Sequence, residues 1–347
     1  MRRLAFLLII IAFISCTRNE QTDFERHFID KTLRFNLIHS GDTAGETFTL
    51  KKIYDDGLWS GRTLNMVNPY QLGAYYYELK DAETDELLYS ESVSTYFSEW
   101  LTTDEAKQKK RSFNESIRIP YPRTSSVLTM YKIDSLNVKI PVWEYEISRK
   151  TRALIEPTKN HNNRMIRLLD SGDPKEKVDI VILGDGYTLK EINKFDKDAS
   201  HFYSILFEKE PFKSRKSDFN VHAIQVPPKN NNGFLMTEYS TFGHDKYALI
   251  SNEWAFREYA TQSPYDFAVI LINDANGKGG SLYNGYTTTT VRSQSEDFII
   301  RHEIGHQIVG LADRFYSDDE APDSTSISPY YDDFNDLINN ILNLHTK

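Results

Sequence analysis

The chain has 347 residues, which is enough for two domains. Hydrophobic residues make up 39% and charged residues 26%, an ordinary globular composition that excludes an intrinsically disordered chain. The formal net charge of −9 leaves no basic excess to neutralise phosphates, so we expect no nucleic-acid partner.

Residues 1–16 have the features of a signal peptide. Arg2 and Arg3 are positively charged, and Leu4–Ile14 is an apolar run far too short to span a bilayer. The run ends at Ser15 and Cys16, the only cysteine. A small residue before a cysteine at this place resembles the bacterial lipobox, in which the cysteine is acylated. We therefore predict an exported protein, lipid-anchored through Cys16 to the bacterial outer membrane or cell surface; an ordinary cleaved signal peptide is the alternative.

Residues 17–33 are predicted to be a tether, and residues 34–148 a β-sandwich domain. Tyr75–Leu79 and Leu87–Tyr89 flank the acidic turn Asp81–Asp85, as in a β-hairpin. Ser116–Ile119 alternates with the period of two that is typical of a half-buried strand. Two further runs have strand character, Val127–Ile133 and Val138–Trp143. Several short strands without a helix-length amphipathic pattern favour a sandwich.

Residues 149–176 are polar and are predicted to connect this domain to a second one, 177–347. In the second domain, short β-branched runs alternate with amphipathic helices, which indicates a mixed sheet covered by helices. The predicted strands are Val178–Leu183, Phe219–Val226, Phe267–Ile272 and Tyr286–Val291, and the predicted helices are Leu189–Phe207 and Tyr247–Ala260. Ser293–Glu296 resembles a capping box that opens a third helix.

This third helix contains the sequence His302-Glu303-Ile304-Gly305-His306. Histidines four residues apart project from one face of a helix, one turn apart, so both imidazoles can bind one zinc ion at about 2.0–2.1 Å. Glu303 lies beside the first ligand, where its carboxylate can deprotonate a water molecule. The spacing therefore predicts one catalytic zinc ion, with His302 and His306 as ligands and Glu303 as the general base.

A third zinc ligand is expected after the helix. Gly310 can end the helix in a left-handed conformation that turns the chain back toward the metal, and Asp313 follows it closely. In the metzincin pattern, the corresponding glycine and third histidine each come one residue earlier. Asp313 is the preferred candidate, and the nearby acids Asp318, Asp319 and Glu320 are the competing ones.

Four segments together resemble the bacterial IgA-peptidase family of zinc metallopeptidases. They are Val178–Thr188, Glu210–Phe212, Phe219–Val221 and, above all, His302–Asp313. The preceding β-rich region is similar to the N-terminal domain that often comes before this catalytic domain. The resemblance implies a zincin-like, metzincin-type α/β domain with an active-site helix, one catalytic zinc ion, and an exported or surface location. It implies a protein or peptide substrate, and an immunoglobulin-like host protein is suggested by the resemblance alone.

The resemblance also gives expectations for residues around the helix. In zincins an edge strand next to the active-site helix pairs with extended substrate, and Thr287, Thr288, Thr289 and Thr290 are the candidates for it. Tyr316 is a candidate for stabilising the oxyanion. Members of the family usually continue well beyond the end of this chain, so we also expect a C-terminally truncated cleft. The second hypothesis is therefore a catalytically impaired surface binding lipoprotein that retains a zincin scaffold.

Overall fold

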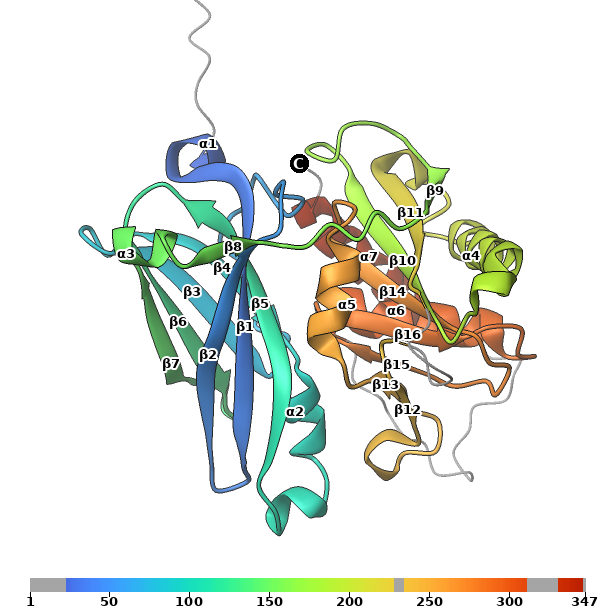
Figure 1. Cartoon of the computed structure of the whole chain (residues 1–347), viewed down its shortest axis with the longest axis horizontal. Helices are drawn as coiled ribbons and strands as arrows, with labels where there is room; N and C mark the ends of the chain where they lie inside the picture. The colour runs from blue at the N-terminus through green and yellow to red at the C-terminus, as the bar shows by residue number, and fades with distance from the viewer. Residues whose placement is uncertain (1–22, 228–233, 311–329, 346–347) are drawn as a thin grey trace, which may run out of the picture.

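The computed structural model describes residues 23–227, 234–310 and 330–345. Two β-rich parts lie side by side, the first running from α1 to β8 and the second from β9 to α7 (Figure 1). Within the described ranges, no helix is both long and apolar enough to span a membrane.

The first part consists of two four-stranded sheets, with the strand orders β5-β1-β2-β8 and β4-β3-β6-β7. Side chains from both sheets meet in one core, for example Phe35 and Leu37 of β1 with Leu79 of β3 and Leu128 of β6. Two sheets around a shared core agree with the predicted N-terminal β domain. The strands are β1 (Phe28–Asp42), β2 (Gly45–Asp55), β3 (Tyr75–Asp81), β4 (Leu87–Val93), β5 (Arg111–Pro122), β6 (Ser126–Ile133), β7 (Lys139–Ile147) and β8 (Ile155–Pro157). The short helices are α1 (Asp23–His27), α2 (Tyr96–Trp100) and α3 (Arg149–Arg152).

The second part is built on a six-stranded mixed sheet of order β15-β16-β14-β10-β11-β9. The four inner strands are parallel, and the two edge strands, β15 and β9, are antiparallel to their neighbours. The strands are β9 (Met165–Leu169), β10 (Val178–Asp185), β11 (Phe219–Gln225), β14 (Phe267–Ile272), β15 (Gly279–Leu282) and β16 (Tyr286–Thr290). A separate pair is formed by β12 (Thr237–Tyr239) and β13 (Ala248–Ile250).

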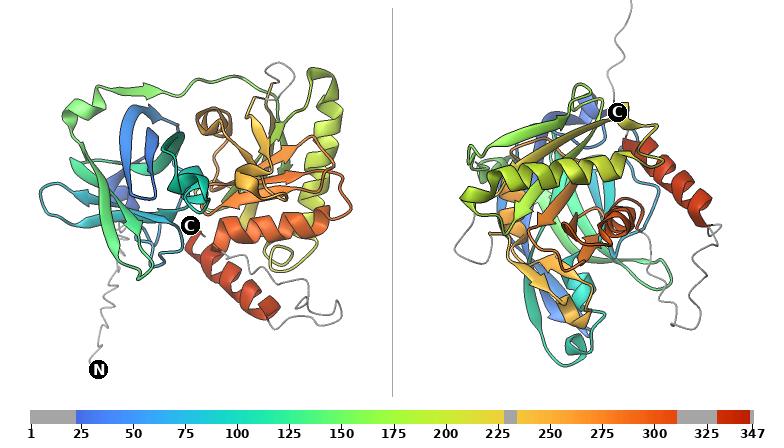
Figure 2. Two further views of the ribbon diagram at one scale, coloured as in Figure 1. Left: turned by 90° about the horizontal axis from the view of Figure 1, so that it is seen from below. Right: turned by 90° about the vertical axis from the view of Figure 1, so that its right-hand side faces the viewer.

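Helices cover both faces of this sheet. α4 (Ile192–Phe207), α6 (Glu296–Val309) and α7 (Tyr330–His345) share one apolar core with the sheet, and α5 (Glu253–Ala260) packs on the opposite face. α6 and α7 lie next to each other (Figure 2). Ile338, Ile341 and Leu342 of α7 are buried in that core, so the C-terminal helix is part of the domain.

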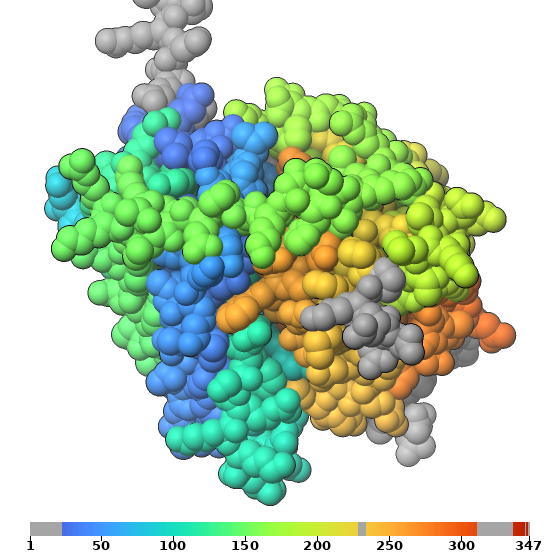
Figure 3. All heavy atoms as spheres, in the orientation of Figure 1, coloured from blue at the N-terminus to red at the C-terminus, as the bar shows by residue number. Residues whose placement is uncertain are grey.

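The structure differs from the sequence-based expectations in three places. β1 begins at Phe28, inside the predicted tether. The predicted helix Tyr247–Ala260 contains the strand β13 before α5 begins at Glu253, because Asn252 caps α5 by accepting the N–H of Ala255. The predicted connector contributes a strand to each part, β8 beside β2 and β9 beside β11. Figure 3 shows this green segment lying across the surface of both parts.

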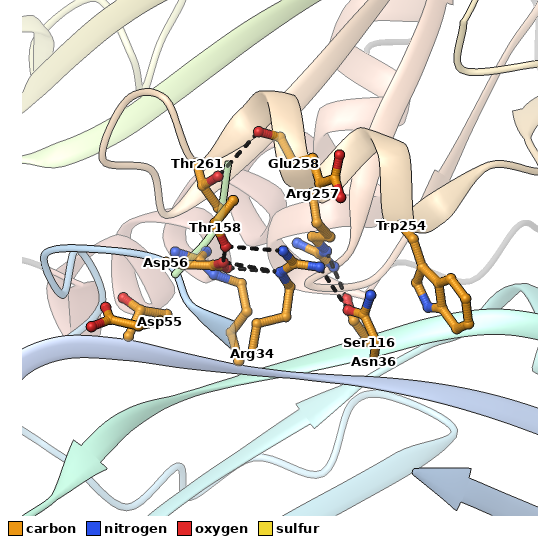
Figure 4. Close-up of polar contacts among 12 residues, drawn as sticks. Arg34, Asn36, Asp55, Asp56, Ser116, Thr158, Trp254, Arg257, Glu258 and Thr261 are labelled. Atoms are coloured by element: carbon orange, nitrogen blue, oxygen red, sulfur yellow. Dashed lines mark hydrogen bonds and ion pairs between the residues drawn. The ribbon is translucent and has the colours of Figure 1, made fainter. Parts of the chain in front are cut away.

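Buried polar groups join the two parts. The Arg257 guanidinium of α5 donates to the Ser116 hydroxyl of β5 at 3.1 Å and to the Glu253 carboxylate at 2.7 Å. Trp254 donates its indole N–H to the Glu115 carbonyl at 2.9 Å. Nearby, within the first part, Arg34 of β1 pairs with Asp56 and donates to Thr158, which follows β8 (Figure 4). A buried charge is costly without partners, so the contact between Arg257 and Ser116 favours one relative position of the two parts.

Candidate metal centre

The motif residues lie on α6, as predicted. The helix begins at Glu296 and ends at Gly310, which has the left-handed angles φ 60° and ψ 39° and donates its N–H to the His306 carbonyl at 3.0 Å. The predicted capping box is wrong in detail, because the N-cap is Ser295 and not Ser293. The Glu296 carboxylate instead accepts the N–H of Arg292 at 2.8 Å, and burial raises the pKa of Glu296.

The two histidines of the motif face each other. The Nε2 atoms of His302 and His306 are 3.0 Å apart, and the ring planes are nearly perpendicular, at 85°. The exposed ring of Phe298 stacks on His302 at a centroid distance of 5.4 Å. An ion about 2.0–2.1 Å from each Nε2 atom can bind both nitrogens, so this pair fits two ligand positions of a zinc ion.

Glu303 lies one residue after the first histidine and is 7% exposed. Two residues of the sheet bond to the helix backbone at Glu303. The Glu303 carbonyl accepts hydrogen bonds from the Ser281 hydroxyl at 2.6 Å and from the Thr287 hydroxyl at 3.3 Å. Thr287 also contacts the side-chain oxygen of Gln307 at 2.9 Å, and the Gln307 amide donates to the Ala268 carbonyl at 2.9 Å. These bonds fix the turn of the helix that contains Glu303 and His306.

The strand at the sheet edge beside this helix is β15. The prediction that Thr287–Thr290 form the edge strand is wrong, because β16 pairs with β14 on one side and with β15 on the other. All four threonines are 0% exposed. A Cβ atom on Gly279 would lie only 3.0 Å from Glu303 Cγ, so the glycine allows β15 to pass close to Glu303. The Gly279 N–H itself donates to the Lys246 carbonyl at 3.2 Å.

The remaining predicted site residues lie outside the described residues. These are Asp313, Tyr316, the alternative ligands Asp318, Asp319 and Glu320, and the lipidation candidate Cys16. Within the part of the chain that the structure describes, no group of three or more His, Cys, Asp or Glu side chains is placed to hold a metal ion. The described geometry thus brings together two of the predicted zinc ligands, His302 and His306, and leaves the third among the predictions.

Sequence reasoning missed the residues that support the helix. Ser281, Asn284 and Gln307 contact it or belong to it, but none has a side chain typical of a metal site. The glycine-rich stretch Asn276–Gly285 is the one feature of the sequence that could have indicated this support. Its Gly279 allows β15 to lie close to Glu303 of the helix. The contacts of this stretch with α6 could not be predicted from residue spacing, because they join segments that are separate in the sequence.

Two family models match the chain. One is described as Peptidase M64 N-terminus and matches residues 23–144, and the other is described as IgA Peptidase M64 and matches residues 166–330. The second match includes all of α6 with its two histidines. No curated protein sequence matches.

Proposed function

Because the chain belongs to the family of IgA-peptidase-like zinc metallopeptidases, we propose that it is a zinc-dependent endopeptidase with a zincin-like second domain. The observation that carries the proposal is the pair of facing imidazoles on α6, with the buried residue Glu303 on the same turn of the helix. His302 and His306 would hold the zinc ion, and Asp313 is the proposed third ligand. When bound, zinc acts as a Lewis acid and lowers the pKa of water.

The proposed work of Glu303 is general-base catalysis. Its carboxylate accepts a proton from the attacking water and later returns it to the leaving amine. A group that does this must be held in place, and the Ser281 and Thr287 hydroxyls hold the backbone at Glu303. No side chain of the protein needs to form a covalent bond to the substrate.

We propose that extended peptide binds along the sheet edge formed by β15, in place of the threonine strand expected from the sequence. β15 is the edge strand nearest Glu303, and it is antiparallel to β16. Its first residue, Gly279, already bridges to Tyr247, so the peptide would pair with residues 280–282. Pairing with a strand edge uses backbone hydrogen bonds, which tolerate many substrate sequences. We propose an extracellular protein as the substrate class, because the chain is predicted to be exported. An immunoglobulin-like host protein is one member of that class, and it rests on the family resemblance.

Replacing Glu303 with Gln tests the enzymatic role. The variant keeps the size of the side chain but loses the base, so we expect it to retain zinc while peptide hydrolysis falls by about 10²–10⁴-fold. Elemental analysis of the purified full chain measures the zinc, and cleavage of a mixed peptide library measures the activity. A His306→Ala variant should lose zinc, whereas His244→Ala, which changes an exposed imidazole far from the motif in sequence, should retain it.

Two results would count against the proposal. If the wild-type protein binds zinc but cleaves no faster than Glu303→Gln, the chain is a surface binding protein on a zincin scaffold. If the wild-type protein binds no zinc, the His302–His306 pair is not a metal centre.

We also propose that the protein is exported and held at the membrane surface by a lipid on Cys16. Replacement of Cys16 with Ala removes the thiol that would be acylated, so the variant should move from the membrane fraction to the soluble fraction. Fractionation followed by immunoblotting measures this. Unchanged membrane retention of Cys16→Ala would contradict lipidation.

A further inference from the structure

The turn between β15 and β16 contacts both the active-site helix and the N-terminal sandwich. The backbone N–H of Asn284, in the middle of this turn, donates to the Gln307 carbonyl of α6 at 3.0 Å. Gln307 directly follows the proposed ligand His306. The carbonyls in the last turn of a helix have no partner within the helix, so Asn284 supplies one of the missing partners.

The side chain of the same asparagine reaches the other part of the molecule. The Asn284 amide donates to the carbonyl of Ser92, in β4 of the sandwich, at 3.1 Å. A second bond runs alongside it, from the N–H of Ser94 to the carbonyl of Tyr283 at 3.0 Å. Ser92 is fully buried, so its carbonyl has no access to water. The hydrogen bond from the Asn284 side chain gives this carbonyl a partner inside the protein.

The conformation of the turn explains why an asparagine is present. Asn284 has φ 52°, in the left-handed region that glycine and asparagine tolerate best. Glycine would allow the same backbone and the same bond to Gln307, but it has no amide to donate to Ser92. Asparagine therefore combines the backbone shape with the link to the sandwich.

The sandwich approaches the same helix end at a second point. A Cβ atom on Gly310 would lie 3.1 Å from Leu72 Cβ and 3.2 Å from the Tyr283 ring, so Leu72 of the β2–β3 loop packs directly against the residue that ends α6. The helix end is thus enclosed by the turn and by the sandwich together.

We propose that Asn284 is a positioning residue of the metal centre, which fastens the C-terminal end of the active-site helix to the N-terminal sandwich and so fixes the position of His306. The proposal rests on the proposed function for its effect on metal binding, but the mechanical link between sandwich and helix is independent of it. On this view the sandwich is part of the catalytic unit and not a separate recognition module.

Asn284→Gly removes the hydrogen bond to the Ser92 carbonyl and keeps the left-handed turn. Hydrogen–deuterium exchange of the full chain, without zinc, measures the helix directly. We expect the amides of residues 303–310 to exchange about fivefold faster in the variant, as the loss of one hydrogen bond predicts. With zinc added, the dissociation constant should rise by about the same factor, and kcat should fall while KM is unchanged.

Asn137→Gly is the matched control. Asn137 also has a positive φ, 60°, but lies in the exposed β6–β7 turn of the sandwich, so its replacement should leave exchange in α6 unchanged. Asn284→Asp keeps the size of the side chain and places a carboxylate oxygen against the Ser92 carbonyl. It should therefore loosen the helix at least as much as glycine does.

Unchanged exchange of residues 303–310 in Asn284→Gly, or wild-type exchange in Asn284→Asp, would overturn the proposal. Faster exchange of these amides in Asn137→Gly would overturn it too, since the effect would then not depend on the link. If none of the proteins binds zinc, the proposed function fails, and the exchange measurement still decides the link between sandwich and helix.

Discussion

His39 of the sandwich is a fully buried imidazole with carboxylates on both sides. Its Nδ1 lies 2.8 Å from the Glu115 carboxylate and its Nε2 lies 3.5 Å from that of Glu46, while Phe48 and Phe97 stack on the two ring faces. Burial by itself lowers the pKa of His39, but Glu115 and Glu46 outweigh it, so the pKa is raised above its ordinary value of 6.5. Folding therefore favours the imidazolium form of His39 relative to the unfolded chain.

This arrangement predicts a pH dependence of stability. A raised folded pKa means that His39 contributes stability below pH 6.5 and that this contribution is lost as the pH rises through the folded pKa. Each unit by which the pKa is raised corresponds to about 1.4 kcal/mol. Thermal unfolding of the wild-type protein should thus show a melting temperature that falls as the pH is raised from 6.5.

Glu115→Gln is the matched variant for this prediction, because it removes the charge while its side-chain oxygen can still accept the Phe97 N–H. Its melting temperature should depend less on pH over the same range. If the melting temperature changes equally with pH in the wild-type protein and in Glu115→Gln, groups other than His39 cause the pH dependence.

At the scale of elements, β15 and α6 pack closely at a single glycine, Gly279. A Cβ atom on Gly279 would lie 2.9 Å from the Thr288 carbonyl and 2.9 Å from Ile299, as well as 3.0 Å from Glu303. The two separations of 2.9 Å are shorter than real Cβ contacts, and the separation of 3.0 Å is tighter than most, so β15 and α6 would have to move apart.

Gly279→Ala should therefore lower both stability and turnover. We expect a loss of about 1–3 kcal/mol in the free energy of unfolding, as for overpacking in a core. A displacement of Glu303 on the order of 1 Å should lower kcat by about 10²-fold. Denaturant unfolding and peptide hydrolysis measure the two effects. Gly45→Ala, at the first residue of β2 with open space around the new methyl group, is the control and should change neither stability nor turnover. An unaffected Gly279→Ala would show that β15 and α6 accommodate the methyl group.

At the scale of the whole molecule, the two parts share buried polar contacts at α5 and at the turn that contacts α6. Arg257 is buried and bonded to Ser116 across the interface, and Arg118 of β5 lies 3.9 Å above the Tyr265 ring. At the other end, Ser92 and Ser94 bond to the β15–β16 turn. The sandwich therefore touches the second part at the place where the proposed metal centre is supported.

Local patterns in the sequence determined the elements and the two histidines. Two short runs on either side of an acidic turn identified the β3–β4 hairpin, and apolar spacing identified α4. The four-residue spacing placed His302 and His306 on one face of α6. Each of these patterns depends on residues close together in the chain. Only the tertiary structure decided that β16 is an inner strand, that β15 forms the edge beside Glu303, and that Asn284 joins the helix end to the sandwich. These features depend on pairing between distant segments: Ser92 and Asn284 are 192 residues apart, and no local pattern specifies which backbone groups meet across that separation.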